Sequence, residues 1–252
     1  AAESHVDRSI NDPSIFFRTN VGGTLNLLNH SFENKIKRFL QVSTDEVYGS
    51  LDRDGYFTEK TNINPNSPYS ASKASADFFV RSYFKTYGLD TIITRCSNNY
   101  GPYQFPEKLI PVVISNAMND IKIPVYGKGD NVRDWIHVSD HCEGIYQALM
   151  KGVSGEVYNF GGDAEITNLN LVLKILKELN KTENLIEHVE DRLGHDFRYA
   201  IDFSKSSKHL NWNPKVKFDD GLKDTIRWYK ENHNWLDSIL SGNYRIFNNN
   251  FK

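Results

Sequence analysis

The sequence predicts an α/β protein built on a doubly wound parallel sheet. Short runs rich in apolar and β-branched residues, at 38–43 and 89–95, alternate with longer segments of helical spacing. Each run ends abruptly in polar residues, and in doubly wound sheets the carboxyl ends of the strands form the edge where ligands bind. We therefore expect a ligand site where these two runs end.

The first half of the chain predicts a helix, a strand, a loop, a second helix and a second strand. The helix at 13–32 begins at Asp12-Pro13 and has apolar residues recurring on one face. A buried strand at 38–43 and a turn-rich loop at 49–67 follow. The second helix spans 68–87, because proline is favoured in a first turn and Gly88 suits the left-handed position after the last turn.

From Tyr103 onward proline and charged residues become more frequent. Helices are expected at 107–119 and at 139–149, the second with Ser139 as its N-cap, and a strand is expected at 157–160. Thr167 should cap an amphipathic helix. Its apolar stripe is Leu169, Val172, Leu173, Leu176 and Leu179, and a last helical segment at 222–240 carries Trp228, Tyr229 and Trp235; we expect all of these in the core.

Composition excludes several classes of protein. The 252 residues are 39% hydrophobic with a net charge of -2, which is typical of globular proteins and shows no basic excess for nucleic acid. No apolar run approaches the roughly 18 residues of a membrane span, and the charged residues within 1–10 exclude a secretory leader. The two cysteines and eight histidines lack metal-ligand spacing. We expect a cytoplasmic protein with no metal and no nucleic-acid or membrane partner.

Two stretches concentrate proton-transfer groups: 43–46, which ends in Asp45-Glu46, and the start of the second helix. Tyr69 and Lys73 lie four residues apart, so they share one helix face and the ammonium can lower the pKa of the phenol. A phenolate base near neutral pH needs about three pKa units, about 4 kcal/mol, of such help. Alone, these groups could be a half-exposed helical pair and a solvated carboxylate pair; together they are candidates for acid and base.

A second Tyr-x-x-x-Lys pattern, Tyr56 to Lys60, shows how easily the spacing arises by chance. It follows Asp54-Gly55 and precedes Asn64-Pro65, so it lies in a turn-rich loop that does not enforce helical geometry. We therefore assign the active site to Tyr69 and not to Tyr56.

Ser43, Tyr69 and Lys73 resemble the catalytic set of the extended short-chain dehydrogenase/reductases. Longer motifs sharpen the resemblance to the dTDP-glucose 4,6-dehydratase family among them, over essentially the whole chain. They are the motifs at 43–49, 69–75, 96–102 and 105–111, with Gly127-Lys128-Gly129, Arg133-Asp134-Trp135 and Gly194-His195-Asp196. Sugar-nucleotide epimerases share the Tyr/Lys pair but lack the Asp-Glu pair in their family pattern.

The resemblance implies a Rossmann-type NAD-binding domain at 1–102, with a returning segment at about 132–162, and a mainly sugar-nucleotide-binding α/β domain at 103–252. Ala1 then corresponds to the end of the family's fourth strand. The pairs Gly22-Gly23 and Gly161-Gly162, and Gly127 with Gly129, lack the spacing of a phosphate-binding Gly-rich turn. We therefore expect an N-terminally truncated chain that does not bind NAD measurably by itself.

Site residues follow from the family's motif positions. The implied NAD contacts are Ala1, Ala2, Glu3, Ser4, Thr19, Ser43, Tyr69, Lys73 and Asn99. The implied contacts to a dTDP-sugar substrate are Ser4, Thr44, Asn98, Lys108, Leu109, Pro124, Val125, Tyr126, Arg133, Asn168, Asp191, Arg192 and His195. Arg133 and Arg192 are the expected diphosphate partners, because a guanidinium binds phosphate oxygens as a fork. Leu193 stands where the family commonly has proline.

The implied reaction is NAD-dependent dehydration of dTDP-glucose to dTDP-4-dehydro-6-deoxyglucose, a step towards deoxysugars such as rhamnose. Tyr69 would take the O4 proton with Lys73 lowering its pKa, and Thr44 would steady O4. Glu46 would remove the C5 proton while Asp45 protonates the departing O6, which requires different environments for the two carboxyls.

Two alternatives stay open. One is another extended-family enzyme, a sugar-nucleotide epimerase or decarboxylase, in which Asp45-Glu46 is incidental. The other is an inactive fragment that only binds sugar nucleotides or dimerises. In the family, helices equivalent to 13–32 and 69–87 pair across a two-fold axis, which implies a homodimer.

Overall fold

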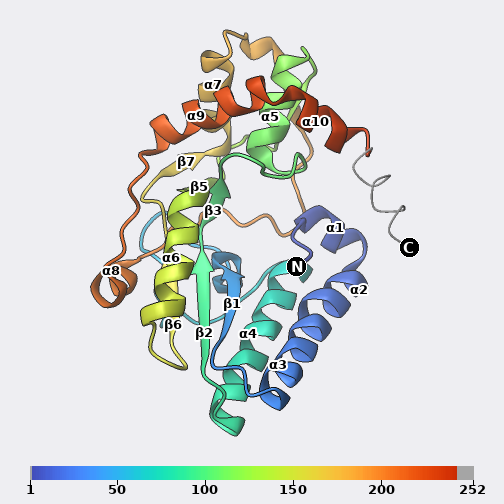
Figure 1. Ribbon diagram of the computed structural model, residues 1–252. Helices are drawn as coiled ribbons and strands as arrows, with labels where there is room; N and C mark the ends of the chain where they lie inside the picture. Colours follow the sequence, from blue (N-terminus) through green and yellow to red (C-terminus); the bar gives the residue numbers. More distant parts are fainter. Residues whose placement is uncertain (1, 243–252) are drawn as a thin grey trace.

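The computed structural model describes residues 2–242. A parallel sheet and its covering helices form the lower part of the molecule, and a helical lobe built from α5, α7, α9 and α10 lies above the carboxyl ends of the strands (Figure 1). Within the described residues, no helix is both long and apolar enough to cross a bilayer.

The lower sheet has three parallel strands in the order β1-β2-β6. They are β1 (Phe39–Thr44), β2 (Thr91–Cys96) and β6 (Val157–Phe160). The central strand β2 is buried along its whole length. β1 is an edge strand of this sheet with Val42 41% exposed. The buried strand predicted at 38–43 is therefore fully buried only at its last residue, Ser43.

The first half of the chain supplies four helical segments on one side of this sheet (Figure 1), of which α4 packs directly on β1 and β2. They are α1 (Val6–Asn11), α2 (Pro13–Phe16), α3 (Gly23–Glu33) and α4 (Pro68–Tyr87). The predicted single helix at 13–32 is divided by a π-helical segment, Phe17–Gly22, and α1 was not predicted. The bounds of α4 are confirmed. It begins with a Ser67/Ser70 capping box, and Gly88 closes it in the left-handed conformation (φ 70°).

The second half of the chain contributes the other side of the sheet and the upper lobe. Its strands are β3 (Asn98–Tyr100), β4 (Ile123–Tyr126), β5 (Val132–His137), β7 (Glu165–Thr167) and β8 (Ile186–Val189). Its helices are α5 (Leu109–Met118), α6 (Val138–Lys151), α7 (Asn168–Glu178), α8 (Ser204–Leu210), α9 (Phe218–Glu231) and α10 (His233–Leu240). The expected N-cap Ser139 is wrong: the ring of His137 caps α6 by accepting the Ser139 N–H.

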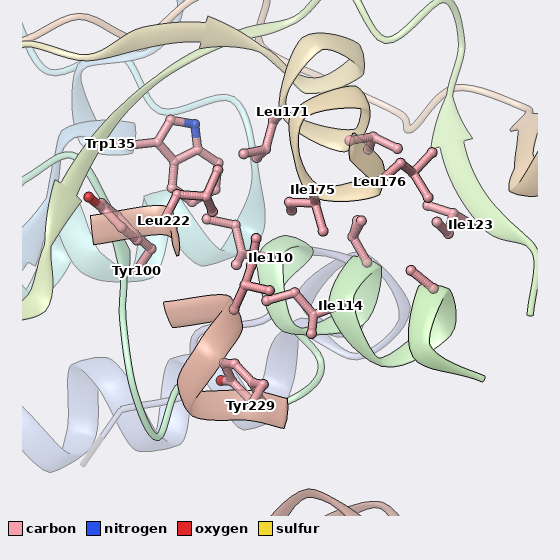
Figure 2. Packing of buried hydrophobic residues seen from close by; sticks show 14 of the residues in the cluster. Tyr100, Ile110, Ile114, Ile123, Trp135, Leu171, Ile175, Leu176, Leu222 and Tyr229 are labelled. Carbon is pink, nitrogen blue, oxygen red and sulfur yellow. The ribbon is translucent and has the colours of Figure 1, made fainter. Parts of the chain in front are cut away.

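The largest core cluster holds the upper lobe together (Figure 2). It joins α5, α7 and α9 to Tyr100 and Trp135, which come from β3 and β5. The buried face of α7 consists of Leu171, Val172, Ile175 and Leu176, so the predicted stripe is rotated and only two of its five members are fully buried. Tyr229 is buried and Trp228 and Trp235 are partly buried, which confirms their structural role.

Backbone segments meet closely where the chain leaves β6. The carboxylate of Asp134 accepts the backbone N–H groups of Gly162 and Ala164 at 3.1 and 2.9 Å. A Cβ on Gly162 would lie 1.8 Å from the carbonyl oxygen of Trp135 and 2.9 Å from the Cα of Ile136, both of them backbone atoms. The two hydrogen bonds from Gly162 and Ala164 hold the Asp134 carboxylate near Asp45, at the end of β1.

We expect Gly162→Ala to destabilise the protein by about 2 kcal/mol or more, because backbone cannot yield as a flexible side chain can. Gly23→Ala is the matched control, since a Cβ there meets nothing within 4 Å. It should be neutral or slightly stabilising. Urea unfolding of both variants measures the difference, and equal unfolding midpoints would contradict the close approach.

Candidate active site

A short 3₁₀ turn, Asp45–Tyr48, follows β1 and holds the two carboxyl groups at the end of the sheet. Thr44 caps this turn: its Oγ1 accepts the Glu46 N–H at 3.2 Å and lies 3.2 Å from Asp45 Oδ1. The cap makes the chain turn sharply, which places Asp45 and Glu46 beside each other but in different surroundings. Asp45 Oδ2 is buried and has no hydrogen-bond partner among the described residues.

The environments of the two carboxyls raise both pKa values to different extents. The pKa of Asp45 is raised well above its usual value, by burial first and then by the charges of Glu46 and Asp134. Burial also raises the pKa of Glu46, but the charges of Arg133 and Lys108 oppose this rise. Asp45 is therefore the group that holds a proton more firmly, and Glu46 is the one that ionises more readily.

Tyr69 lies in the first turn of α4 and is 9% exposed. Its backbone N–H donates to Ser9 Oγ at 3.1 Å, and its ring packs edge-on to Phe16. Burial raises the pKa of the phenol well above its usual value; the charge of Glu46 adds to the rise and a hydrogen bond with Thr44 opposes it. The phenol therefore faces Thr44, Asp45 and Glu46, as the sequence predicted.

Lys73 departs from its predicted role. Its ammonium donates to the carbonyl of Val42 at 2.7 Å, which ties α4 to β1, and burial lowers its own pKa. The expected lowering of the Tyr69 pKa by Lys73 is wrong for this arrangement, because the cation is directed at a strand carbonyl instead of the phenol. By contrast, Tyr56 is 57% exposed in the 49–67 loop, as predicted for the chance copy of the pattern.

Arg133, predicted to bind the diphosphate, is buried in this structure, with only 7% of the residue exposed. Its guanidinium donates to the carbonyls of Val132, Asp196 and Phe197, and it stacks on the ring of Tyr199 at 4.2 Å. Its charge is the largest influence lowering the pKa of Glu46. In this structure Arg133 acts first as the electrostatic partner of Glu46.

Arg192 and its neighbours form a second polar cluster on the side of the upper lobe. Arg192 pairs with Asp7 of α1, and its guanidinium lies 4.9 Å from the ring centre of Tyr126. His195 contacts Asp191 at 2.7 Å and packs edge-on to Tyr126. Tyr126, Asp191, Arg192 and His195 are thus brought together, as expected.

The residues predicted to contact NAD form two groups. Ser43 and Asn99 lie with Lys73 around Cys96: Cys96 Sγ contacts the Ser43 carbonyl, and Asn99 Nδ2 donates to Cys96 Sγ. The second group is Ala2, Glu3, Ser4 and Thr19, where the backbone of Glu3 exchanges two hydrogen bonds with Asn20. Ala1 lies outside the described residues.

The remaining predicted substrate contacts differ in what they can offer. The side chain of Val125 belongs to the core of the upper lobe, and the side chain of Leu109 packs against that core. Neither side chain is therefore free to contact a substrate. Pro124 is exposed and Asn98 is half-buried on β3. Asn168 Oδ1 is buried and has no hydrogen-bond partner among the described residues. Lys108 donates to the carbonyl of Ser4.

Sequence reasoning missed several polar residues of this region. Tyr199 and Asp196 share a hydrogen bond of 2.6 Å behind Arg133, and Asp134 adds its charge beside Asp45. The thiol of Cys96 is buried with a pKa raised to about 12. Asp134 and Asp196 belong to motifs that were recognised, but those motifs gave these two residues no role. Among the described residues, no group of three or more His, Cys, Asp or Glu could hold a metal ion.

Comparisons with known proteins identify the family of the chain. The family model described as GDP-mannose 4,6 dehydratase matches residues 1–225. The dTDP-glucose 4,6-dehydratases of Streptomyces niveus and Xanthomonas campestris pv. campestris are 48% and 50% identical. These matches cover 96% and 98% of this chain, and 71% and 75% of the relatives.

Solved structures show the same relationship. A dTDP-glucose 4,6-dehydratase of Streptomyces venezuelae, crystallised with NAD bound, is 51% identical with a TM-score of 0.92 over 93% of this chain and 73% of that one. A UDP-glucose 4-epimerase of Thermus thermophilus in complex with NAD is 27% identical with a TM-score of 0.87, over 91% of this chain and 76% of that one. The chain therefore belongs to the dTDP-glucose 4,6-dehydratase family of the extended short-chain dehydrogenase/reductases.

Proposed function

We propose that the protein dehydrates dTDP-glucose to dTDP-4-dehydro-6-deoxyglucose with NAD as its bound redox partner. The observation that carries this proposal is the pair of adjacent carboxyls, Asp45 and Glu46, which face one phenol and have differently raised pKa values. An elimination of water needs one acid and one base close together, and this pair meets that need. In a sugar-nucleotide epimerase, the oxidation and reduction at C4 need only the tyrosine as proton-transfer group. The presence of Asp45 and Glu46 beside Tyr69 therefore argues against an epimerase.

The donor set at the strand ends suits the nicotinamide side of NAD. Ser43 and Asn99 offer a hydroxyl and an amide, and Tyr69 and Lys73 offer a phenol and an ammonium around the same point. These groups match a ribose and a carboxamide in chemistry. When bound, NAD would accept the hydrogen with its electron pair from C4 of the sugar and return it at C6. We propose that residues 1–102 with about 132–162 form the part of the NAD site that contacts the nicotinamide and its ribose, and that 103–252 mainly hold the sugar nucleotide.

The residues of the chain then supply the proton steps. Tyr69 takes the proton from O4 as C4 is oxidised, and Thr44 holds the oxygen by hydrogen bonding. Because burial raises the pKa of the phenol, the positive charge of bound NAD would have to stabilise the phenolate. The new ketone acidifies C5, and Glu46 accepts the C5 proton because neighbouring cations favour its ionised form. Asp45 gives its proton to O6, so that the C6–O6 bond breaks and water leaves. Glu46 returns a proton to C5 when C6 is reduced.

The remaining polar groups place the nucleotide. Arg192 and Lys108 supply positive charge for the diphosphate, whereas Arg133, which was also predicted for that role, keeps its charge beside Glu46. Asn168 offers its unpartnered carbonyl oxygen to a donor on the ligand.

We also propose that two copies of the chain pair through α2–α4. Large apolar side chains are exposed along these helices, among them Phe17 (64%), Leu27 (55%) and Phe78 (56%). Phe32 and Tyr87 join the far ends of α3 and α4 with their rings 5.3 Å apart and both exposed. Apolar side chains exposed along neighbouring helices are typical of a subunit interface.

The central test is Glu46→Gln in enzyme that carries bound NAD; the change keeps the size of the side chain but removes the base. C4 oxidation should survive, so absorbance of reduced NAD should build up on adding dTDP-glucose. Product formation and uptake of solvent deuterium at C5 should fall by about 10²- to 10⁴-fold, the usual value of a positioned general base.

Two tyrosine variants provide the comparison. Tyr69→Phe should abolish both the absorbance change and the product, and Tyr56→Phe, in the exposed loop, should match the wild type. Wild-type C5 exchange in Glu46→Gln would overturn the assignment of the base. A wild-type protein that makes no 4-keto-6-deoxy product would overturn the proposed function.

The raised pKa of Asp45 gives a separate prediction for stability. The folded state binds the Asp45 proton more tightly than the unfolded state, so folding loses stability as pH rises above the unfolded pKa. Asp45→Asn removes this penalty. We expect it to be about 1 kcal/mol more stable at pH 7, with a difference that shrinks as pH falls towards 4. Thermal unfolding across this range measures the difference; a loss of stability at pH 7 would contradict the protonated acid.

The proposed pairing is tested by the mass of the protein in solution. Phe78→Arg places a charge in the exposed apolar face of α4 and should convert a dimer to a monomer in sedimentation velocity. Tyr146→Arg is the control, because Tyr146 is equally exposed but lies on α6, on the other side of the sheet. A monomeric wild-type protein at micromolar concentration would rule out the pairing.

A further inference from the structure

Helix α1 lies where the sheet layer meets the upper lobe (Figure 1). It is only six residues long, yet its side chains contact both parts. Ser9 is fully buried and accepts the backbone N–H of Tyr69, in the first turn of α4. Arg8 donates to both carboxylate oxygens of Glu107, at 3.0 and 2.8 Å, just before α5.

Asp7, the third polar residue of α1, is directed at the proposed diphosphate site. Its Oδ1 pairs with Nε of Arg192, and its Oδ2 accepts a hydrogen bond from Nη2 of Arg192 at 2.9 Å. The same Oδ2 accepts the hydroxyl of Tyr126 at 3.3 Å. One carboxylate thus holds two residues that come from the end of β4 and from the segment after β8, more than a hundred positions away in the sequence.

Among residues 2–242, no hydrogen bond or ion pair involves Nη1, at the opposite edge of the Arg192 guanidinium. Arginine has five N–H donors, and Asp7 occupies only the edge formed by Nε and Nη2. The ring of Tyr126 supports the guanidinium plane at 4.9 Å. A fork that is already held in place loses less rotamer freedom when a phosphate binds to its open edge.

We propose that Asp7 is a positioning residue for the nucleoside diphosphate subsite, which it serves by fixing Arg192 and Tyr126 and not by touching the ligand. This inference rests on the proposed function, because it takes Arg192 as a diphosphate ligand. Ser9 lies two residues further along the same helix and holds the backbone of Tyr69. Helix α1 therefore sets the diphosphate at a fixed separation from the phenol that reacts with the sugar.

A purely structural role for α1 makes a different prediction. If the helix only tied the two parts of the molecule together, the Arg8–Glu107 contact would matter as much as the contact of Asp7 with Arg192. Glu107→Gln weakens that first contact and leaves Arg192 and Tyr126 untouched. It is therefore the matched control for Asp7→Asn.

The test is the binding of dTDP to the protein, measured by calorimetry, together with steady-state kinetics on dTDP-glucose. Asp7→Asn should weaken dTDP binding about tenfold and raise KM similarly while kcat changes less than about twofold, since only ligand placement is lost. Asp7→Glu keeps the carboxylate and should bind dTDP within about threefold of the wild type. Glu107→Gln should bind it as the wild type does.

Several results would overturn the inference. Asp7→Asn could bind dTDP as tightly as the wild type or more tightly, which would mean that Asp7 only repels the diphosphate. Equal losses of dTDP affinity in Asp7→Asn and Glu107→Gln would mean that α1 only connects the two parts of the molecule. If the wild type binds dTDP but does not convert dTDP-glucose, the proposed function fails, while the comparison of dTDP affinities still decides the role of Asp7.

Discussion

The burial of two neighbouring carboxyl groups at the end of β1 is the constraint on which the rest of the site depends. A buried carboxylate without partners costs several kcal/mol, so the fold must either keep it protonated or surround it with cations. Asp45 takes the first course: it has an unpartnered oxygen and two negative neighbours, and its pKa is raised strongly. Glu46 takes the second, because Arg133, Lys108 and Arg192 oppose the effect of burial.

Two of those cations, Arg133 and Lys108, donate their hydrogen bonds to backbone carbonyls, as Lys73 also does. Arg133 is bound to three carbonyls, and Lys108 and Lys73 are each bound to one. Carbonyl acceptors satisfy a buried cation without neutralising its charge, so the field at Glu46 is preserved. A carboxylate partner in the same place would cancel that field, and the base would become harder to ionise.

The site also spans two parts of the molecule that have separate cores. The phenol and the carboxyls belong to the sheet layer, while Arg192, Tyr126 and Asn168 belong to segments of the upper lobe. Helix α1 contributes to their relative placement: Ser9 anchors it to α4, and Asp7 and Arg8 reach Arg192 and Glu107. A ligand that reaches from one part to the other would be held in register by this short helix.

The sequence by itself determined the features that depend on neighbouring residues. The capping signals at Ser67-Pro68 and Gly88 predicted the bounds of α4, and the apolar runs predicted β2 and β6 to within two residues. Tyr69 was distinguished from Tyr56 by the same local signals. The motifs at 43–49 and 69–75 were enough to indicate the family and the proton-transfer groups.

Only the tertiary structure decided where long side chains end and which strand faces are covered. The direction of Lys73, the enclosure of Arg133 and the core position of Val125 depend on partners tens of residues away. The π-helical segment and the rotated face of α7 arise because packing against neighbouring helices overrides local periodicity. Periodicity and capping act within a few residues, whereas burial and charge pairing act between segments that only the fold brings together.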